Sequence, residues 1–200
     1  MKTKMLYLGI GAVLVAALLV GFQLSRRPYT YRGSKIDPPV PAADFELSNQ
    51  HGQKFRLSEQ RGEIVLLFFG YSNCPDVCPL TMSKFKSIKE ELGDQADKVR
   101  FIFVTVDPER DTKERLLEYV KVFDPEIVAL TGSRAELEPV WKSYGVYQAK
   151  QDTGSAAGYS VDHTARTYLI DQEGNWRLTY PFEMEKADII SDVRHLINKG

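Results

Sequence analysis

Short apolar runs, each bounded by turn-forming or charged residues, recur through the chain after residue 60. A run of this kind without strict alternation is typical of a strand buried on both faces of a sheet. The runs lie at residues 64–69, 99–106, 127–130, 166–170 and 176–180. A turn signal at residues 171–174 separates the last two, which predicts an antiparallel hairpin.

Amphipathic stretches alternate with these runs and predict helices. Apolar residues at helical spacing mark residues 79–92, 116–123 and 185–198. Asp111 with Glu114, and Ser133 with Glu136, have the spacing of capping boxes and predict two helix starts. The order β-α-β-α-β-α-β-β-α favours an α/β domain with a central mixed sheet flanked by helices, parallel at its centre with an antiparallel edge hairpin.

Residues 5–22 show a different pattern, an uncharged apolar run flanked by two lysines and two arginines. Extended to residue 24, the run matches the roughly 30 Å of a bilayer core as a helix. A cleaved signal peptide is the alternative, but its apolar core usually has only about 7–15 residues, and no small-x-small site ends this run. We expect residues 1–27 to form an N-terminal transmembrane anchor, whose orientation the flanking charges do not decide.

Residues 28–43 contain four prolines, which oppose helix formation and favour extended backbone. They are therefore expected to link the anchor to a globular domain over residues 44–200.

Composition narrows the class of protein. The chain carries 26 basic and 27 acidic residues. The anchor holds four of the bases and no acid, so the remainder has a net charge of −5. The chain has no excess of positive charge that would favour binding of nucleic acid. Two cysteines in 200 residues exclude a disulfide-rich scaffold.

Both cysteines lie in one segment, Cys74-Pro-Asp-Val-Cys78-Pro79, between a predicted strand and a predicted helix. Chemistry in open α/β sheets gathers beyond the carboxyl ends of the strands. Pro79 fits the first helical position, which places Cys78 near the N-cap, where the helix dipole lowers the pKa of a thiol. The alternatives are a disulfide that only staples the loop and two inert, buried thiols.

Two cysteines this close can form a disulfide or bind one metal ion, and soft thiolates favour Cu(I), zinc or iron–sulfur centres. His163 precedes a central strand, and in a thioredoxin-like topology its loop packs against the cysteine loop, although a role that only caps this loop fits equally well. His51, in a turn between short strands, and His195, in the terminal helix, are not expected to take part. Asp107 ends a predicted strand and is a candidate for orienting a group of the site, or a simple turn residue.

Three motifs occur in order along the chain. They are Cys74-Pro-Asp-Val-Cys78-Pro79, Val106-Asp-Pro-Glu-Arg-Asp-Thr112, and Val161-Asp-His-Thr164 ahead of Tyr168-Leu-Ile-Asp171. Together they resemble the Sco/SenC family of copper proteins, over roughly residues 40–198. The resemblance implies a thioredoxin-like fold, and it implies that Cys74, Cys78 and His163 bind copper as Cu(I) or Cu(II).

The resemblance also implies a role in cytochrome c oxidase assembly. A member would deliver copper to the binuclear copper site of oxidase subunit II, or reduce the cysteines of that site, and a thiol reductase would restore its own dithiol. The family implies a single-pass anchor in the cell membrane with the soluble domain on the extracytoplasmic side. This chain lacks the lipoprotein cysteine of some Gram-positive members. The expected protein is a metallochaperone with thiol–disulfide reductase activity as a second capacity.

Two other functions stay open on the sequence. One is a thiol–disulfide oxidoreductase or a thiol peroxidase of the thioredoxin–peroxiredoxin type. Against it, Tyr71 stands three residues before Cys74, where that branch of peroxidases has Thr or Ser, and no Cys-x-x-Cys motif is present. The other is a membrane-tethered binding module whose cysteines only form a staple.

Overall fold

The computed structural model describes residue 15 and residues 28–155 and 158–199. The chain divides into two units, Met1–Thr30 and Tyr31–Gly200, and the second contains the fold. The predicted anchor, residues 1–27, lies outside the described residues apart from Val15. Within the described ranges, no helix has the length and apolar character needed to cross a membrane.

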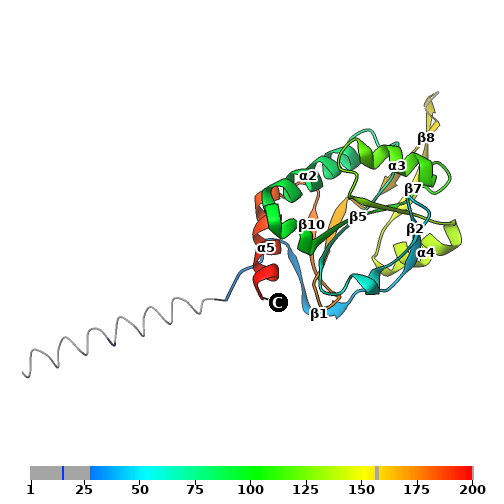
Figure 1. Ribbon diagram of the computed structural model, residues 1–200. Coiled ribbons are helices and arrows are strands. Elements are labelled where there is room, and N and C mark those ends of the chain that lie inside the picture. Colours follow the sequence, from blue (N-terminus) through cyan, green and yellow to red (C-terminus); the bar gives the residue numbers. More distant parts are fainter. Residues whose placement is uncertain (1–14, 16–27, 156–157, 200) are drawn as a thin grey trace, which may run out of the picture. The chain divides into compact units, whose positions relative to one another are not determined.

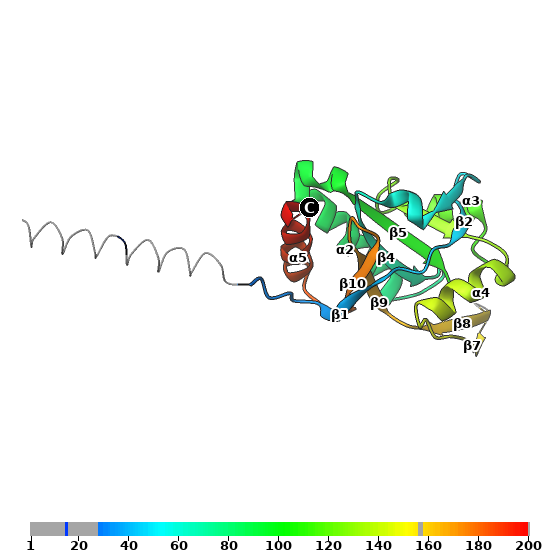
Figure 2. The same cartoon turned by 90° about the horizontal axis from the view of Figure 1, so that it is seen from below.

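A mixed sheet forms the centre of the fold (Figures 1 and 2). Its strands run in the order β1-β10-β9-β4-β5-β6-β2-β3, and β7 and β8 form a separate two-stranded sheet. The strands are β1 (Ser34–Pro41), β2 (Glu46–Asn49), β3 (Lys54–Arg56), β4 (Ile64–Gly70), β5 (Val99–Thr105), β6 (Val128–Thr131), β7 (Gln148–Ser155), β8 (Gly158–His163), β9 (Arg166–Ile170) and β10 (Asn175–Pro181).

Helices cover both faces of the sheet. They are α2 (Val77–Leu92), α3 (Lys113–Lys121), α4 (Arg134–Ser143) and α5 (Lys186–Lys199), with short 3-10 turns at Leu57–Gln60 and Gly93–Lys98. Neighbouring residues of β4 point to opposite faces: Phe68 packs on Phe103, on the side of α2, while Phe69 packs on Tyr144, which ends α4. On the first side, α2 and α5 lie side by side (Figure 1).

The central strands are where the apolar runs predict them. All seven residues of β4 are buried, with β5 parallel on one side and β9 antiparallel on the other. Burial on both faces explains the uninterrupted apolar run, since neither set of alternate side chains meets water. The predicted hairpin joins β9 to β10, and the central mixed sheet flanked by helices is confirmed.

The first strand corrects the predicted linker. Prolines make residues 28–43 look like a linker, yet Ser34–Pro41 forms β1, which pairs with β10 at the edge of the sheet. The pairing is interrupted between Lys35 and Val40, and Pro38 and Pro39 fall within that interruption. An edge strand tolerates proline because it needs ladder hydrogen bonds on one side only. The domain therefore begins before residue 44.

One of the two predicted helix caps is also wrong. The side chain of Thr112 accepts the Arg115 N–H and caps α3, whereas Asp111 is fully buried and bonds other residues. The Ser133–Glu136 capping box at the start of α4 is confirmed. The β7–β8 hairpin is absent from the sequence prediction because its strands are polar and flank a Gly- and Ser-rich turn.

Removal of residues 28–43, which contain β1 and the two residues before it, should destabilise the domain. The buried carboxylate of Asp192 accepts the backbone N–H groups of Arg32 at 3.0 Å and Gly33 at 2.9 Å. Hydrogen bonds to a charged group contribute about 1.5–3 kcal/mol each to stability. The free energy of unfolding of fragment 44–200 should therefore be at least ~2 kcal/mol lower than that of fragment 28–200. Urea denaturation measures this, with fragment 31–200 as the matched control that keeps both donors. Equal stability of 44–200 and 28–200 would show that β1 is a dispensable linker.

Candidate metal centre

The cysteine loop lies between the end of β4 and the start of α2. A turn closed by the Cys74 N–H and the Tyr71 carbonyl at 3.2 Å leads into it. Asp111 fixes the position of the loop, because its carboxylate accepts hydrogen bonds from the Ser72 hydroxyl at 2.6 Å and the Thr105 hydroxyl at 2.7 Å. The loop is thereby tied to the end of the neighbouring strand β5.

Helix α2 begins earlier than Pro79 predicts. Asp76 is the N-cap, Val77 is the first helical residue, and Cys78 lies in the first turn. The Cys78 side chain is fully buried beneath the loop, while Cys74 is partly exposed. Gly70 leaves the room for this arrangement, since a Cβ atom there would lie 2.8 Å from the Cys78 sulfur.

His163 reaches the cysteines from the end of β8. Its ring packs edge-on against the rings of Phe68 and Tyr71, with centroids 6.0 and 5.8 Å away. The Tyr71 hydroxyl also accepts the Val161 N–H at 3.2 Å, so one tyrosine contacts both the histidine and its strand. The prediction that the loop before β9 packs against the cysteine loop is confirmed for His163.

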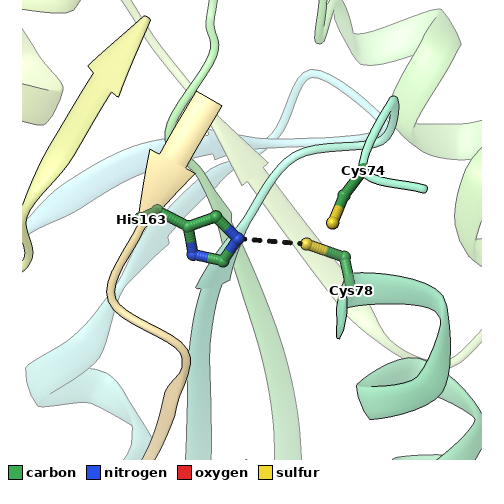
Figure 3. Close-up of side chains that lie close together, drawn as sticks. All are labelled: Cys74, Cys78 and His163. Atoms are coloured by element: carbon green, nitrogen blue, oxygen red, sulfur yellow. Dashed lines mark hydrogen bonds between the residues drawn. The ribbon is translucent and has the colours of Figure 1, made fainter. Parts of the chain in front are cut away.

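The three side chains converge on one point (Figure 3). The Cys74 and Cys78 sulfurs and a His163 ring nitrogen all lie within 4.8 Å of one another, and the Cys78 Sγ to His163 Nε2 distance is 3.4 Å. His163 Nδ1 lies 3.2 Å from the Thr164 carbonyl oxygen. In the tautomer with the proton on Nδ1, the Nδ1–H group donates a hydrogen bond to this carbonyl. The Nε2 lone pair then faces the two sulfurs, as a metal ligand requires.

The two thiols differ in acidity. Interaction with the neighbouring Cys78 thiol, together with His163 and the N–H groups of Asp76 and Cys78, holds the pKa of Cys74 far below its ordinary value, against the effect of burial. Burial and the neighbouring Cys74 raise the pKa of Cys78. The position in the helix predicts an acidic Cys78, and this prediction is wrong: Cys78 is fully buried, which disfavours its thiolate, while Cys74 is partly exposed.

The other candidate residues lie apart from this cluster. His51 is exposed in the turn between β2 and β3, and His195 is half-buried against the Tyr31 ring. The buried Asp107 carboxylate is paired with Arg110 and accepts the Tyr159 hydroxyl at 2.8 Å; within the described ranges it has no hydrogen bond to a cluster residue. The Asp107 side chain can therefore affect the site through these two partners.

Arg110 and Tyr159 lie near the site, and the sequence does not predict this role for either of them. Arg110 lies inside the second motif, between Asp107 and Asp111, which is a signal that it belongs to the same region. For Tyr159 no signal existed, because its partners lie about 50 residues away along the chain.

The donor set fits a soft metal ion. Two thiolates and one imidazole are a combination that copper or zinc accepts, and three protein ligands leave a position free for exchange. The partial exposure of Cys74 gives that position access to solvent.

Cys74 should react with iodoacetamide far faster than Cys78. Because the Cys74 thiolate persists at low pH, its alkylation rate should change little between pH 5.5 and 7.5, whereas an ordinary thiol would slow about 100-fold over this range. Peptide mass spectrometry of the reduced protein measures both rates, with Cys74→Ser and Cys78→Ser as matched controls. Faster alkylation of Cys78, or a tenfold loss of Cys74 reactivity per pH unit, would contradict this assignment of acidity.

Comparison with known proteins places the chain in one family. The family model SCO1/SenC matches residues 34–198. A SCO2-like protein of Rickettsia prowazekii is 31% identical over 187 residues, covering 92% of this chain and 90% of that protein. The structure of Bradyrhizobium japonicum ScoI with copper bound is 35% identical, with a TM-score of 0.72, and the match covers 78% of this chain and 99% of that one.

A third comparison carries a description of function. The structure of BsSco, described as having a disulfide switch and as a member of the Sco family of cytochrome c oxidase assembly proteins, is 26% identical with a TM-score of 0.66. The match covers 86% of this chain and 99% of that one. The family resemblance and the thioredoxin-like α/β fold expected from it are confirmed, and the chain belongs to the SCO1/SenC family.

Proposed function

We propose that this chain binds one copper ion through Cys74, Cys78 and His163 and serves in the assembly of cytochrome c oxidase. The observation that carries the proposal is the convergence of two sulfurs and one imidazole nitrogen within 4.8 Å. The copper-bound structure of a relative that is 35% identical supports the choice of metal. Thiolates favour Cu(I), and the added imidazole makes the site suitable for Cu(II) as well.

The partner in this proposal is oxidase subunit II, whose binuclear copper site would receive the ion. The description of BsSco as a member of a family of oxidase assembly proteins supports this direction. We further propose that residues 1–27 anchor the chain in the cell membrane, with the domain on the extracytoplasmic side. An uncharged run of 18 residues in that segment supports the anchor.

The same pair of cysteines suits a second task, reduction of the target's disulfide before copper is loaded. The partly exposed Cys74 thiolate attacks the target disulfide, which forms a mixed disulfide and releases one target thiolate. The Cys78 sulfur then displaces the second target thiolate as its proton leaves, which forms the Cys74–Cys78 disulfide. Two electrons pass to the target, and an external thiol reductase must return two electrons to the pair.

A general thiol oxidoreductase or thiol peroxidase is the competing function, and the acidic Cys74 is the observation that favours it. It requires rapid turnover of peroxide or of generic disulfides, on the order of 1–10³ s⁻¹. In our proposal the pair reacts once per delivery or reduction event, and such turnover is not expected.

Copper titration tests the ligand set directly. The reduced fragment 28–200 should bind one copper per chain, and its Cu(II) form should show a thiolate charge-transfer band. Cys74→Ser or Cys78→Ser should abolish the band, and His163→Ala should weaken binding at least about tenfold, because each removes one of three donors. His51→Ala is the matched control and should change nothing. Unaltered binding in Cys78→Ser and His163→Ala would contradict a three-ligand site.

Oxidation of the pair should abolish copper binding. Only deprotonated thiols act as ligands, so a Cys74–Cys78 disulfide leaves His163 alone. Equilibrium dialysis of fragment 28–200 before and after oxidation measures this, and reduction should restore one copper per chain. Retention of stoichiometric copper by the fully oxidised protein would overturn the role of the thiolates.

A further inference from the structure

The strand that supplies His163 is not part of the main sheet. β7 and β8 pair only with each other, as a two-stranded ribbon that Figure 2 shows at the end of the domain next to α4. An isolated two-stranded hairpin is at best marginally stable in water. Contacts with the rest of the domain must therefore set the position of His163 over the cysteines.

Three side chains make most of the specific contacts between the hairpin and the loop after β5. Arg110 donates from Nη1 to the Tyr159 carbonyl oxygen at 2.8 Å, and its guanidinium lies 3.7 Å from the centroid of the Tyr159 ring. The Tyr159 hydroxyl donates to Asp107 at 2.8 Å, and the Arg110 Nε pairs with the same carboxylate. We call Asp107, Arg110 and Tyr159 the hairpin latch.

The latch is built around a buried carboxylate. The Asp107 side chain is fully buried and that of Arg110 is 23% exposed, so their charge-assisted bonds are screened little by water. A second pair across the same junction, Lys150 with Glu109, is 36% and 51% exposed, and surface pairs of this kind contribute little. The latch is therefore the stronger of the two connections.

Strand geometry connects the latch to the metal ligand. Tyr159, Val161 and His163 alternate along β8, so they share one face of the strand, the face turned toward the domain. At one end Tyr159 is held by the latch; in the middle Val161 is buried and its N–H bonds Tyr71; at the other end His163 meets Cys78. Fixing Tyr159 therefore fixes the depth and direction at which His163 approaches the sulfurs.

We propose that the hairpin latch is a positioning device for the metal centre, in which Arg110 and Tyr159 hold His163 in place to complete the ligand set. Its copper-dependent consequences rest on the function proposed above; its effect on the hairpin does not. The latch residues are not among the three ligand side chains. They act through β8 and through Tyr71, because the Arg110 guanidinium lies 5.6 Å from the centroid of the Tyr71 ring, which packs on His163. Without it Cys74 keeps its place in the loop after β4 and Cys78 keeps its place on α2, while His163 samples other positions.

Two variants loosen the latch and leave Asp107 with a partner. Arg110→Lys keeps a cation beside the buried Asp107 carboxylate and loses the planar group that bonds and stacks on Tyr159. Tyr159→Phe keeps the ring and loses the hydroxyl bond to Asp107. Arg177→Lys is the matched control, since Arg177 pairs with the buried Asp171 in the β9–β10 turn, at the end of β9 away from the cysteine loop.

Hydrogen–deuterium exchange of the reduced, metal-free fragment 28–200 tests the latch without copper. Residues 158–163 should exchange about tenfold faster in Arg110→Lys and measurably faster in Tyr159→Phe, while α2 and β4 stay as protected as in the parent. Arg177→Lys should leave residues 158–163 unchanged. Unchanged exchange of the hairpin in both latch variants, or equal loss of protection throughout the domain, would overturn the proposal.

Copper affinity in a double-mutant cycle then shows whether the latch acts through His163. Arg110→Lys should lower Cu(I) affinity about tenfold in the parent and have no effect in the His163→Ala background, because only the histidine depends on the latch. Equal losses in both backgrounds would show a general structural effect and contradict the proposal. If the parent binds no copper, the proposed function fails, while the exchange experiment still decides on the latch.

Discussion

The chemistry of this protein depends on one contact, between Cys78 and a histidine 85 residues further along the chain. The two cysteines are local to each other, and alone they form only a dithiol. The three side chains form a cluster that could hold a metal ion because the β7–β8 hairpin brings His163 to 3.4 Å from the Cys78 sulfur. Two separate parts of the fold supply the cluster. The main sheet and α2 hold the two cysteines, and the separate β7–β8 sheet holds His163.

The environment gives the two sulfurs unequal roles. Cys78 is buried against Gly70 and Phe68 and keeps its proton in the metal-free state, whereas Cys74 is partly exposed and acidic. An exposed thiolate can contact a partner protein while the buried sulfur stays behind as the second ligand or the resolving thiol. Such an asymmetric pair suits thiol–disulfide exchange, in which one thiolate attacks and a second thiol resolves the mixed disulfide.

Much of this was predictable from the sequence because it depends on local pattern. The apolar runs of β4, β5 and β9 indicate strands buried on both faces, and the spacing of the two cysteines indicates a shared site. Features that depend on distant partners were not predictable. The prolines of β1 conceal an edge strand whose partner, β10, lies near the other end of the chain. The acidity of Cys74 rather than Cys78 follows from the burial of Cys78, and sequence spacing does not contain that information.

The most direct test of the account is copper K-edge X-ray absorption of the protein loaded with one copper per chain. Two sulfur ligands and one imidazole nitrogen are predicted for the reduced protein, with the nitrogen lost in His163→Ala. A copper environment of sulfur alone in the parent, or an imidazole signal that persists in His163→Ala, would contradict the claim that the hairpin completes the metal centre.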